Sequence, residues 1–265
     1  MPKVKVNGIN MHYEVHGDGF PIVMITGVSF CLRIWDKALI DELSKKLKVL
    51  LFDNRGSGQT DIPEGEFTIK MMADDIIGLM DVLNIKRAHV LGFSMGGMIA
   101  QEVAINYPQK VEKLILWGTA CGGRKSVPPD LAAYKLLLGA IEDLTPERMA
   151  KSTIPLAFTR DFIKNNPEYI NEKIQKILKC RIPFSSYARQ VKAMLNFNTC
   201  RRLKKMDIPT LIMQGKKDIL VPPKNAEILV ELIPGAKLVF FEQSAHAIFS
   251  HEPDLFLKVL FEFLT

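Results

Sequence analysis

Short runs of apolar residues alternate along the chain with longer segments whose apolar positions recur every three or four residues. The short runs have the length of buried β-strands, and the longer segments have helical periodicity, as between Thr68 and Leu83. Strands that are apolar throughout are typical of a parallel sheet covered by helices on both faces. The strands expected on this basis are 21–25, 49–52, 88–91, 114–117, 209–213 and 237–241.

The first residues of the chain predict two more strands, 4–6 and 11–15. The connection between them contains Asn7-Gly8, a strong signal for a β-hairpin. The N-terminal segment alternates polar and apolar residues and lacks the long apolar stretch of a secretory signal. No run of about 18 apolar residues indicates a membrane span. We therefore expect a soluble, cytoplasmic protein.

The strand–helix alternation stops between residues 122 and 203. No comparable apolar run occurs there, whereas helical periodicity continues, for example in 131–138 and 169–178. Gly122-Gly123 and Pro128-Pro129 mark the start of this segment as turns. The sequence therefore predicts an α/β core formed by residues 1–121 and 204–265, with residues 122–203 as a helical insertion.

The pentapeptide Gly92-Phe93-Ser94-Met95-Gly96 lies between an expected strand and an expected helix. A serine on a sharp strand-to-helix turn often has a strained backbone with positive φ, at about 1–3 kcal/mol. Glycines two residues before and after it remove side chains that would collide. The free N–H groups of the helix N-terminus can stabilise negative charge. Ser94 is therefore a candidate nucleophile.

A serine hydroxyl near pH 7 needs a general base and a group that orients this base. Residues that follow the carboxyl ends of parallel strands meet at one edge of the sheet, where Ser94 also belongs. His246 follows the last expected strand and is the base we favour. Asp218 follows the strand 209–213 and is the favoured acid. Asp53 also follows a strand, but we interpret it as part of a structural turn in which it pairs with Arg55. The remaining histidines, read as structural or surface residues, are His12, His16, His89 and His251.

The oxyanion formed in acyl transfer needs fixed hydrogen-bond donors. The backbone N–H of Met95, directly after the candidate nucleophile, is one candidate. The loop after the strand 21–25 begins Thr26-Gly27-Val28, and the N–H of Val28 is the second candidate. Gly27 permits the unusual backbone geometry that this loop would need.

With this set of residues the chain resembles the α/β-hydrolase family, whose catalytic residues follow the order Ser, Asp, His. The resemblance covers nearly the whole chain and includes the Asp53-x-Arg55-Gly56-x-Gly58 turn. It is strongest to the branch of small carboxylesterases, enol-lactonases and cofactor-free haloperoxidases. This branch implies an α/β fold with a mostly parallel eight-stranded sheet and a helical cap after the sixth strand. Thr26 stands where the family often has histidine, and Val28 where an aromatic residue is frequent.

Composition narrows the alternatives further. Of 265 residues, 48% are hydrophobic and 24% charged, as in a globular protein with a substantial core. The segment 122–206 holds 17 Lys and Arg against 7 Asp and Glu, a net charge of +10 within a chain of +6. Stacking aromatics are not interleaved with these cations, so we expect no nucleic-acid partner.

The four cysteines lack C-x-x-C spacing, which argues against a metal site and favours free thiols.

The sequence thus predicts a serine hydrolase of carboxylic esters with short to medium chains, acting through an acyl-enzyme without metal or cofactor. Open alternatives are an enol-lactonase, a C–C hydrolase of ring-cleavage products and a perhydrolase; a ligand receptor without turnover is disfavoured. The basic segment would suit an anionic substrate, although a solvated helical surface is the commoner cause of such a charge bias. We expect a monomer or homodimer. Candidate substrate-binding residues are Phe30, Trp35, Leu137, Phe158, Met194 and Phe197.

Overall fold

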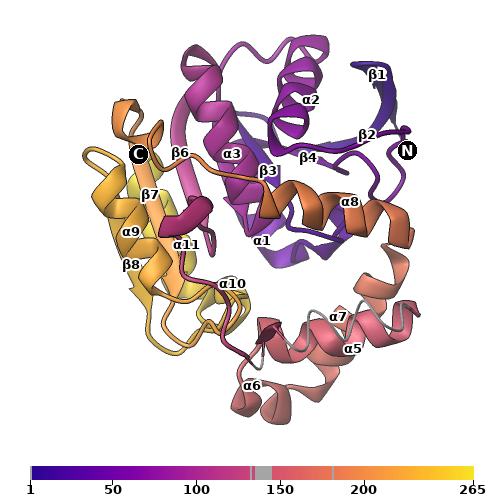
Figure 1. Ribbon diagram of the computed structural model, residues 1–265, viewed down its shortest axis with the longest axis vertical. Helices are drawn as coiled ribbons and strands as arrows, with labels where there is room; N and C mark the ends of the chain where they lie inside the picture. Colours follow the sequence, from indigo (N-terminus) through magenta and orange to yellow (C-terminus); the bar gives the residue numbers. More distant parts are fainter. Residues whose placement is uncertain (1, 132, 135–144, 181) are drawn as a thin grey trace.

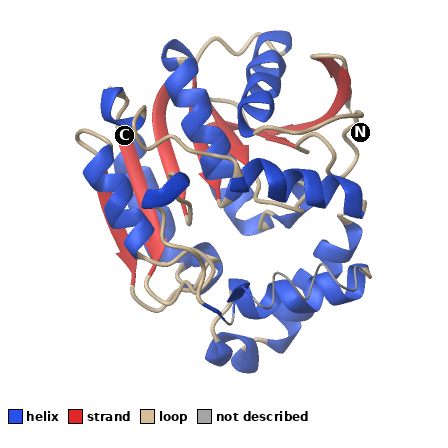
Figure 2. Ribbon diagram, in the orientation of Figure 1, coloured by secondary structure: helices blue, strands red, loops and turns tan. Residues whose placement is uncertain are grey.

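The computed structural model describes residues 2–131, 133–134, 145–180 and 182–265. Eight strands form one sheet in the order β1-β2-β4-β3-β5-β6-β7-β8 (Figures 1 and 2). The pairs β1–β2 and β2–β4 are antiparallel, and all other neighbours are parallel. The strands are β1 Lys3–Val6, β2 Ile9–His16, β3 Phe20–Ile25, β4 Leu47–Phe52, β5 Ala88–Phe93, β6 Val111–Trp117, β7 Thr210–Gly215 and β8 Lys237–Phe241.

The expected hairpin joins β1 and β2. Asn7 and Gly8 form its turn with φ values of 48° and 83°, the positive pair that a type I′ turn requires. The register pairs Val6 with Ile9 directly across this turn. The hairpin prediction from the Asn-Gly dipeptide is therefore confirmed.

The parallel strands are buried on both faces because helices cover both. Along β3, Ile22 and Met24 belong to one apolar cluster and Val23 and Ile25 to another, as expected when successive side chains point to opposite faces. Helices α1 and α11 pack on the first face, and α2, α3 and α9 on the second (Figure 1). These helices are α1 Lys37–Ser44, α2 Ile69–Val82, α3 Met95–Asn106, α9 Lys224–Leu232 and α11 Pro253–Leu264.

Four described helices lie between β6 and β7. Three of them, α5 to α7, pack around their own small cluster of Ile154, Phe158 and Ile170. They lie apart from the sheet, whereas α8 returns to it (Figure 1). The separate helical domain and its boundaries stay a prediction, and most of the helix expected at 131–138 falls outside the described residues. The four helices are α5 Pro146–Ala157, α6 Arg160–Asn165, α7 Pro167–Lys179 and α8 Phe184–Leu195.

The remaining helical elements are short. Across the described ranges, no helix combines the length and apolar character needed to cross a membrane. The short elements are η1 Leu32–Ile34, η2 Pro108–Lys110, η3 Gly123–Lys125, η4 Leu203–Lys205 and α10 Ile248–His251.

The expected internal pairing of Asp53 with Arg55 is wrong. Asp53 Oδ2 lies 2.7 Å from Nδ1 of the buried His12, and Asp53 Oδ1 accepts the Leu32 N–H at 2.7 Å. Arg55 pairs instead with Asp75 of α2, with Nε 2.6 Å from Oδ2. Asp53 therefore binds the start of η1, whereas Arg55 binds the helix α2.

Candidate active site

Ser94 occupies the turn between β5 and α3 with φ 58° and ψ −121°. This positive φ agrees with the strained turn expected from the sequence. Glycine is required on either side of it. A Cβ at Gly92 would lie 2.3 Å from the Gly96 carbonyl oxygen, and one at Gly96 would lie 2.1 Å from the Ile25 carbonyl oxygen. The glycines thus allow the turn to pack against β3, with Ser94 left 8% exposed at a cavity.

His246 and Asp218 form a buried hydrogen-bonded pair. Nδ1 of His246 lies 2.7 Å from Oδ2 of Asp218. Because the carboxylate can only accept, this nitrogen is the one that carries hydrogen. Asp218 Oδ1 also accepts the backbone N–H groups of Leu220 and Val221, at 2.9 and 2.8 Å. The turn after β7 therefore orients the Asp218 carboxylate independently of its contact with the imidazole.

The imidazole ring of His246 packs against Phe93, the residue before the candidate nucleophile. Its centroid lies 4.7 Å from that of Phe93, the residue before Ser94. The Trp117 indole N–H donates to the His246 carbonyl oxygen at 2.9 Å and holds the loop in place. Nε2 of His246 is buried and has no hydrogen-bond partner among the described residues, Ser94 included. His246 and Ser94 line the same cavity, and this nitrogen is free to accept a proton there.

The loop after β3 is held by residues distant in sequence. Val28 and Ser29 line the cavity, and Ser29 has a positive φ of 62°. The Ser29 N–H donates to Oε1 of Gln190 on α8 at 3.0 Å. Gln190 is fully buried, and its Nε2 donates to the Arg55 carbonyl at 3.2 Å and to Ser57 Oγ at 2.9 Å. One amide thus connects α8 to two core loops.

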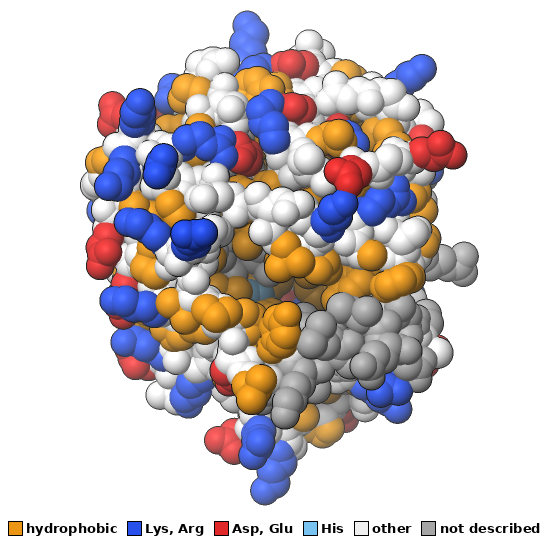
Figure 3. Space-filling model, in the orientation of Figure 1, with side chains coloured by type: hydrophobic (Ala, Val, Ile, Leu, Met, Phe, Trp, Pro, Cys, Tyr) orange, Lys and Arg blue, Asp and Glu red, His pale blue; other side chains and the backbone are white. Residues whose placement is uncertain are grey.

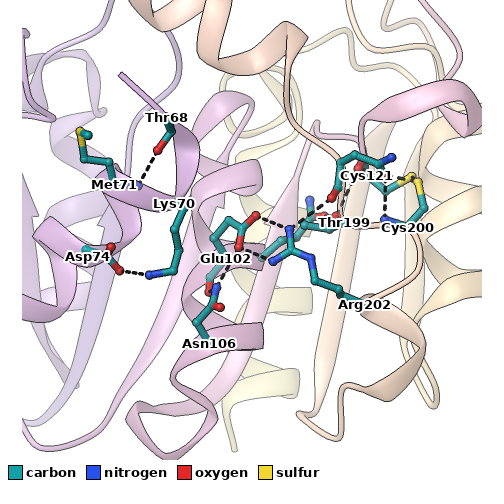
Figure 4. Close-up of polar contacts among 12 residues, drawn as sticks. Thr68, Lys70, Met71, Asp74, Glu102, Asn106, Cys121, Thr199, Cys200 and Arg202 are labelled. Carbon is teal, nitrogen blue, oxygen red and sulfur yellow. Dashed lines mark hydrogen bonds and ion pairs between the residues drawn. The ribbon is translucent and has the colours of Figure 1, made fainter. Parts of the chain in front are cut away.

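The expectation of four free thiols is wrong for one pair. Cys31, at the end of the same loop, forms a disulfide with Cys180, which follows α7, with Cα atoms 5.3 Å apart. Cys121 and Cys200 are free cysteines whose sulfurs lie 2.6 Å apart (Figure 4). Burial and the contact with Cys200 raise the pKa of the Cys121 thiol to about 12. Neither pair could be predicted from the sequence, because the partners lie far apart along the chain.

The segment that returns from α8 to the core is fixed on α3. Arg202 Nη1 lies 2.7 Å from Oε2 of the buried Glu102, and Thr199 Oγ1 donates to Gln101 Oε1 at 2.7 Å (Figure 4). Because α3 begins directly after Ser94, these contacts connect the end of the helical segment to the helix that follows the candidate nucleophile.

The cavity beside Ser94 and His246 has a volume of about 110 Å³ and a mainly apolar wall. Figure 3 shows a hollow rimmed by hydrophobic side chains, with a histidine visible inside it. Phe30, Trp35 and Phe158 line this cavity, and their role in substrate binding stays a prediction. Leu137 lies outside the described residues.

The prediction that Met194 and Phe197 bind substrate is wrong. Neither lines the cavity, and both pack into the apolar cluster that contains α2 and α3. The physical reason is that α8 returns to the sheet, so its apolar side is part of the core. An amphipathic pattern has the same appearance whether its apolar face covers a core or a pocket.

Several cavity residues were missed by the sequence analysis. Tyr187 of α8 and Trp117 of β6 line the wall, and burial raises the pKa of the Tyr187 phenol. Lys173 of α7 and Asp36 lie there as a charged pair. No local pattern distinguishes these residues from others of the same type on neighbouring turns.

This architecture and the position of Ser94 define an α/β hydrolase. Residues 21–253 match the sequence profile of the family with the alpha/beta hydrolase fold, and the chain belongs to this family. The putative carbamate hydrolase RutD of Azorhizobium caulinodans is 27% identical over 99% of this chain and 98% of its own length.

Solved structures of hydrolases are also similar. The enol-lactonase from Burkholderia xenovorans LB400 has 26% identity and a TM-score of 0.88, with 99% of both chains covered. A thermophilic esterase from Thermogutta terrifontis has 26% identity and a TM-score of 0.85, covering 100% of this chain and 98% of its own. A meta-cleavage product hydrolase from Pseudomonas fluorescens IP01 has 25% identity, with a TM-score of 0.84 and coverage of 100% and 97%. The predicted family and fold class are confirmed, and the chain is a hydrolase.

Proposed function

We propose that this hydrolase cleaves carboxylic esters of short to medium chain through an acyl-enzyme. The observation that carries the proposal is the buried pair of His246 and Asp218, 2.7 Å apart. His246 lines the same cavity as the strained Ser94. Such a pair gives an imidazole the tautomer and orientation needed to accept a serine proton.

In the proposed reaction, Nε2 of His246 accepts the hydroxyl proton as Ser94 attacks the ester carbonyl. Catalytic hydrogen bonds often tighten only when substrate binds, which agrees with an unpartnered Nε2. Asp218 stabilises the imidazolium, which then protonates the leaving alcohol. Water repeats the sequence on the acyl-enzyme, with His246 again as the base, and releases the acid.

The proposed oxyanion donors are the N–H groups of Met95 and Val28. Met95 is the first residue of α3, so its N–H has no intrahelical acceptor. Val28 lies on the cavity wall, in the loop held by the contact of Ser29 with Gln190. Each such donor contributes about 2.7–4 kcal/mol to transition-state stabilisation in comparable sites.

Helices α5 to α8 are proposed to act as a cap over this site. Leu156, Ala157 and Phe158 of this segment form part of the cavity wall. The Ala157 carbonyl accepts the N–H of Ala247, next to His246, at 3.0 Å. A small apolar cavity closed by such a cap supports acyl chains of short to medium length.

The test is turnover of a p-nitrophenyl ester series by the wild type and by Ser94→Ala. We expect Ser94→Ala to abolish turnover and labelling by a fluorophosphonate, while wild-type activity peaks well below about twelve acyl carbons. Wild-type-like turnover in the variant would remove Ser94 from the mechanism.

An enol-lactonase is the second candidate, favoured by the similarity to the Burkholderia enzyme. The names of the other relatives add a carbamate and a ring-cleavage product to the substrates worth testing. Parallel assays with an ester, an enol-lactone, a vinylogous diketone, a carbamate and hydrogen peroxide separate these reactions. A kcat/KM for one of the others far above that of every ester would replace the ester as the proposed substrate.

A further inference from the structure

The cavity wall contains a charged pair outside the proposed triad. Nζ of Lys173 lies 2.7 Å from Oδ1 of Asp36 and donates to the Ile34 carbonyl oxygen at 3.2 Å. The Tyr169 hydroxyl lies 3.1 Å from both Asp36 oxygens and 2.6 Å from Ser250 Oγ. Lys173 and Tyr169 come from α7, whereas Asp36 precedes α1 and Ser250 belongs to α10. The pair therefore forms where the helical segment meets the core.

Burial of this ion pair is unfavourable, because both charged side chains lose contact with water. The side chains of Lys173 and Asp36 are 7% and 15% exposed. Burial lowers the pKa of the Lys173 ammonium, and the charge of Asp36 opposes this effect. A buried ion pair contributes little net stability, because desolvation offsets the attraction. Lys173 is also the one lysine or arginine among the described residues of the cavity wall, so the basic excess of the helical segment otherwise lies elsewhere.

Some hydrogen-bond donors of the subsite are not used by its contacts. An ammonium has three N–H donors, and the contacts to Asp36 and Ile34 use two of them. Both Asp36 oxygens already accept hydrogen bonds, from Lys173 and Tyr169. Trp35 lines the same cavity, and its buried indole N–H has no partner among the described residues. A ligand that complements these groups presents a hydrogen-bond acceptor.

The charge of the pair decides which acceptor fits. Asp36 neutralises Lys173, so the subsite has no net charge to offer an anion. A substrate carboxylate would lie close to the Asp36 carboxylate in surroundings of low dielectric, where like charges repel strongly. An uncharged oxygen avoids this repulsion and still accepts from an N–H.

We propose that Lys173, together with Trp35, forms a specificity subsite for an uncharged carbonyl oxygen that the substrate carries besides its scissile ester. This inference rests on the proposed function, whose substrate class it narrows to esters or lactones with a second, oxo group.

The test compares p-nitrophenyl 4-oxopentanoate with the pentanoate and with the hydrogen succinate, which have acyl parts of similar size. A second pair, the 5-oxohexanoate and hexanoate esters, tests an oxo group that lies one carbon further from the scissile ester. We expect wild-type kcat/KM to favour an oxo ester over its alkyl partner by about tenfold or more, the value of one hydrogen bond to a buried donor. The variant Lys173→Met should bring this ratio close to one.

The matched control is Lys176→Met on the same helix. Lys176 pairs with Glu172 and does not line the cavity, so both the ratio and the activity should stay as in the wild type. Asp36→Asn leaves the charge of Lys173 uncompensated and should shift preference toward the succinate ester. If Lys173→Met does not fold, the uncharged double variant Asp36→Asn, Lys173→Met replaces it.

A purely structural pair would lower kcat/KM for all esters by the same factor in these variants and leave the ratios unchanged. That result, or a wild-type preference for the succinate ester, would overturn the proposal. If the wild type hydrolyses none of the esters, the proposed function fails on its own. Binding then decides the subsite: 2-hexanone should bind more tightly than n-hexane, which lacks the carbonyl oxygen, and Lys173→Met should remove the difference. The fluorescence of Trp35 and Trp117, which both line the cavity, reports this binding.

Discussion

Nδ1 of His246 lies 2.7 Å from Oδ2 of Asp218, and both side chains are almost entirely shielded from water. The carboxylate is held from its other side by the Leu220 and Val221 N–H groups. Its orientation is therefore set by the β7 turn and is independent of the histidine. This relationship leads directly to the first prediction.

Asp218→Asn should lower kcat for p-nitrophenyl esters by about 10⁴-fold, because an amide in this position favours the wrong imidazole tautomer. The fold should persist, since the amide oxygen can still accept from the Leu220 N–H. Circular dichroism checks the fold, and burst-phase kinetics measure acylation. A loss of less than tenfold would show that another group orients His246.

Ser94→Gly should stabilise the protein while removing activity. A residue with a Cβ is strained by about 1–3 kcal/mol at the φ of 58° found for Ser94. Glycine removes this strain, but its greater freedom in the unfolded chain lowers stability by roughly 0.5–1 kcal/mol. The net expectation is a free energy of unfolding that rises by about 1 kcal/mol, measured by urea denaturation. Ser94→Ala, the control, retains the Cβ and should show no such gain. Equal stability of the two variants would contradict a strained turn.

The double variant Cys31→Ser, Cys180→Ser should be less stable than the oxidised wild type by about 2–5 kcal/mol, as for other disulfides that close long loops. The bond spans a sequence separation of 149 residues. Dithiothreitol should bring the wild type to the level of the variant and leave the variant unchanged. In unfolded, unreduced protein two thiols should titrate, those of Cys121 and Cys200. Four titrating thiols would disprove the disulfide.

His89 should make folding less favourable in mild acid. Burial lowers the pKa of His89 from 6.5 to about 4. Between these values the unfolded chain binds a proton that the folded protein does not, so stability falls as pH drops through this window and is constant for this group above it. His89→Leu should therefore gain more stability relative to the wild type at pH 5 than at pH 7.5. Equal differences at the two pH values would exclude His89 as the cause.

The sequence predicted the fold because its signals are local. Apolar runs such as Pro21–Ile25 and the Asn7-Gly8 turn each specify one element, and parallel strands then bring their carboxyl ends to a common edge. This rule selected Ser94, Asp218 and His246; Ser94 and His246 line one cavity, and Asp218 contacts the His246 imidazole. Their catalytic roles stay a prediction.

What the sequence did not predict depends on contacts made by the helical segment. Gln190 and Lys173 are ordinary polar residues of amphipathic helices until the tertiary fold buries them. Cys180, the disulfide partner of Cys31, lies in the helical segment between β6 and β7, and no rule of sequence spacing identifies it. Met194 was misassigned because periodicity shows which face of a helix is buried, but not which structure buries it.

The contacts of Gln190 restrict how this enzyme can be recombined with others. Its side chain bonds at once to Ser29 and to the turn at Arg55 and Ser57, so the loop beside the nucleophile takes part of its shape from α8. A chimaera that imports a foreign set of helices between β6 and β7 would lose this amide unless the donor has glutamine at the same place. Exchanging substrate preference by swapping that segment therefore also alters the loop that lines the cavity, and a graft that retains Gln190 has the better prospect of remaining active.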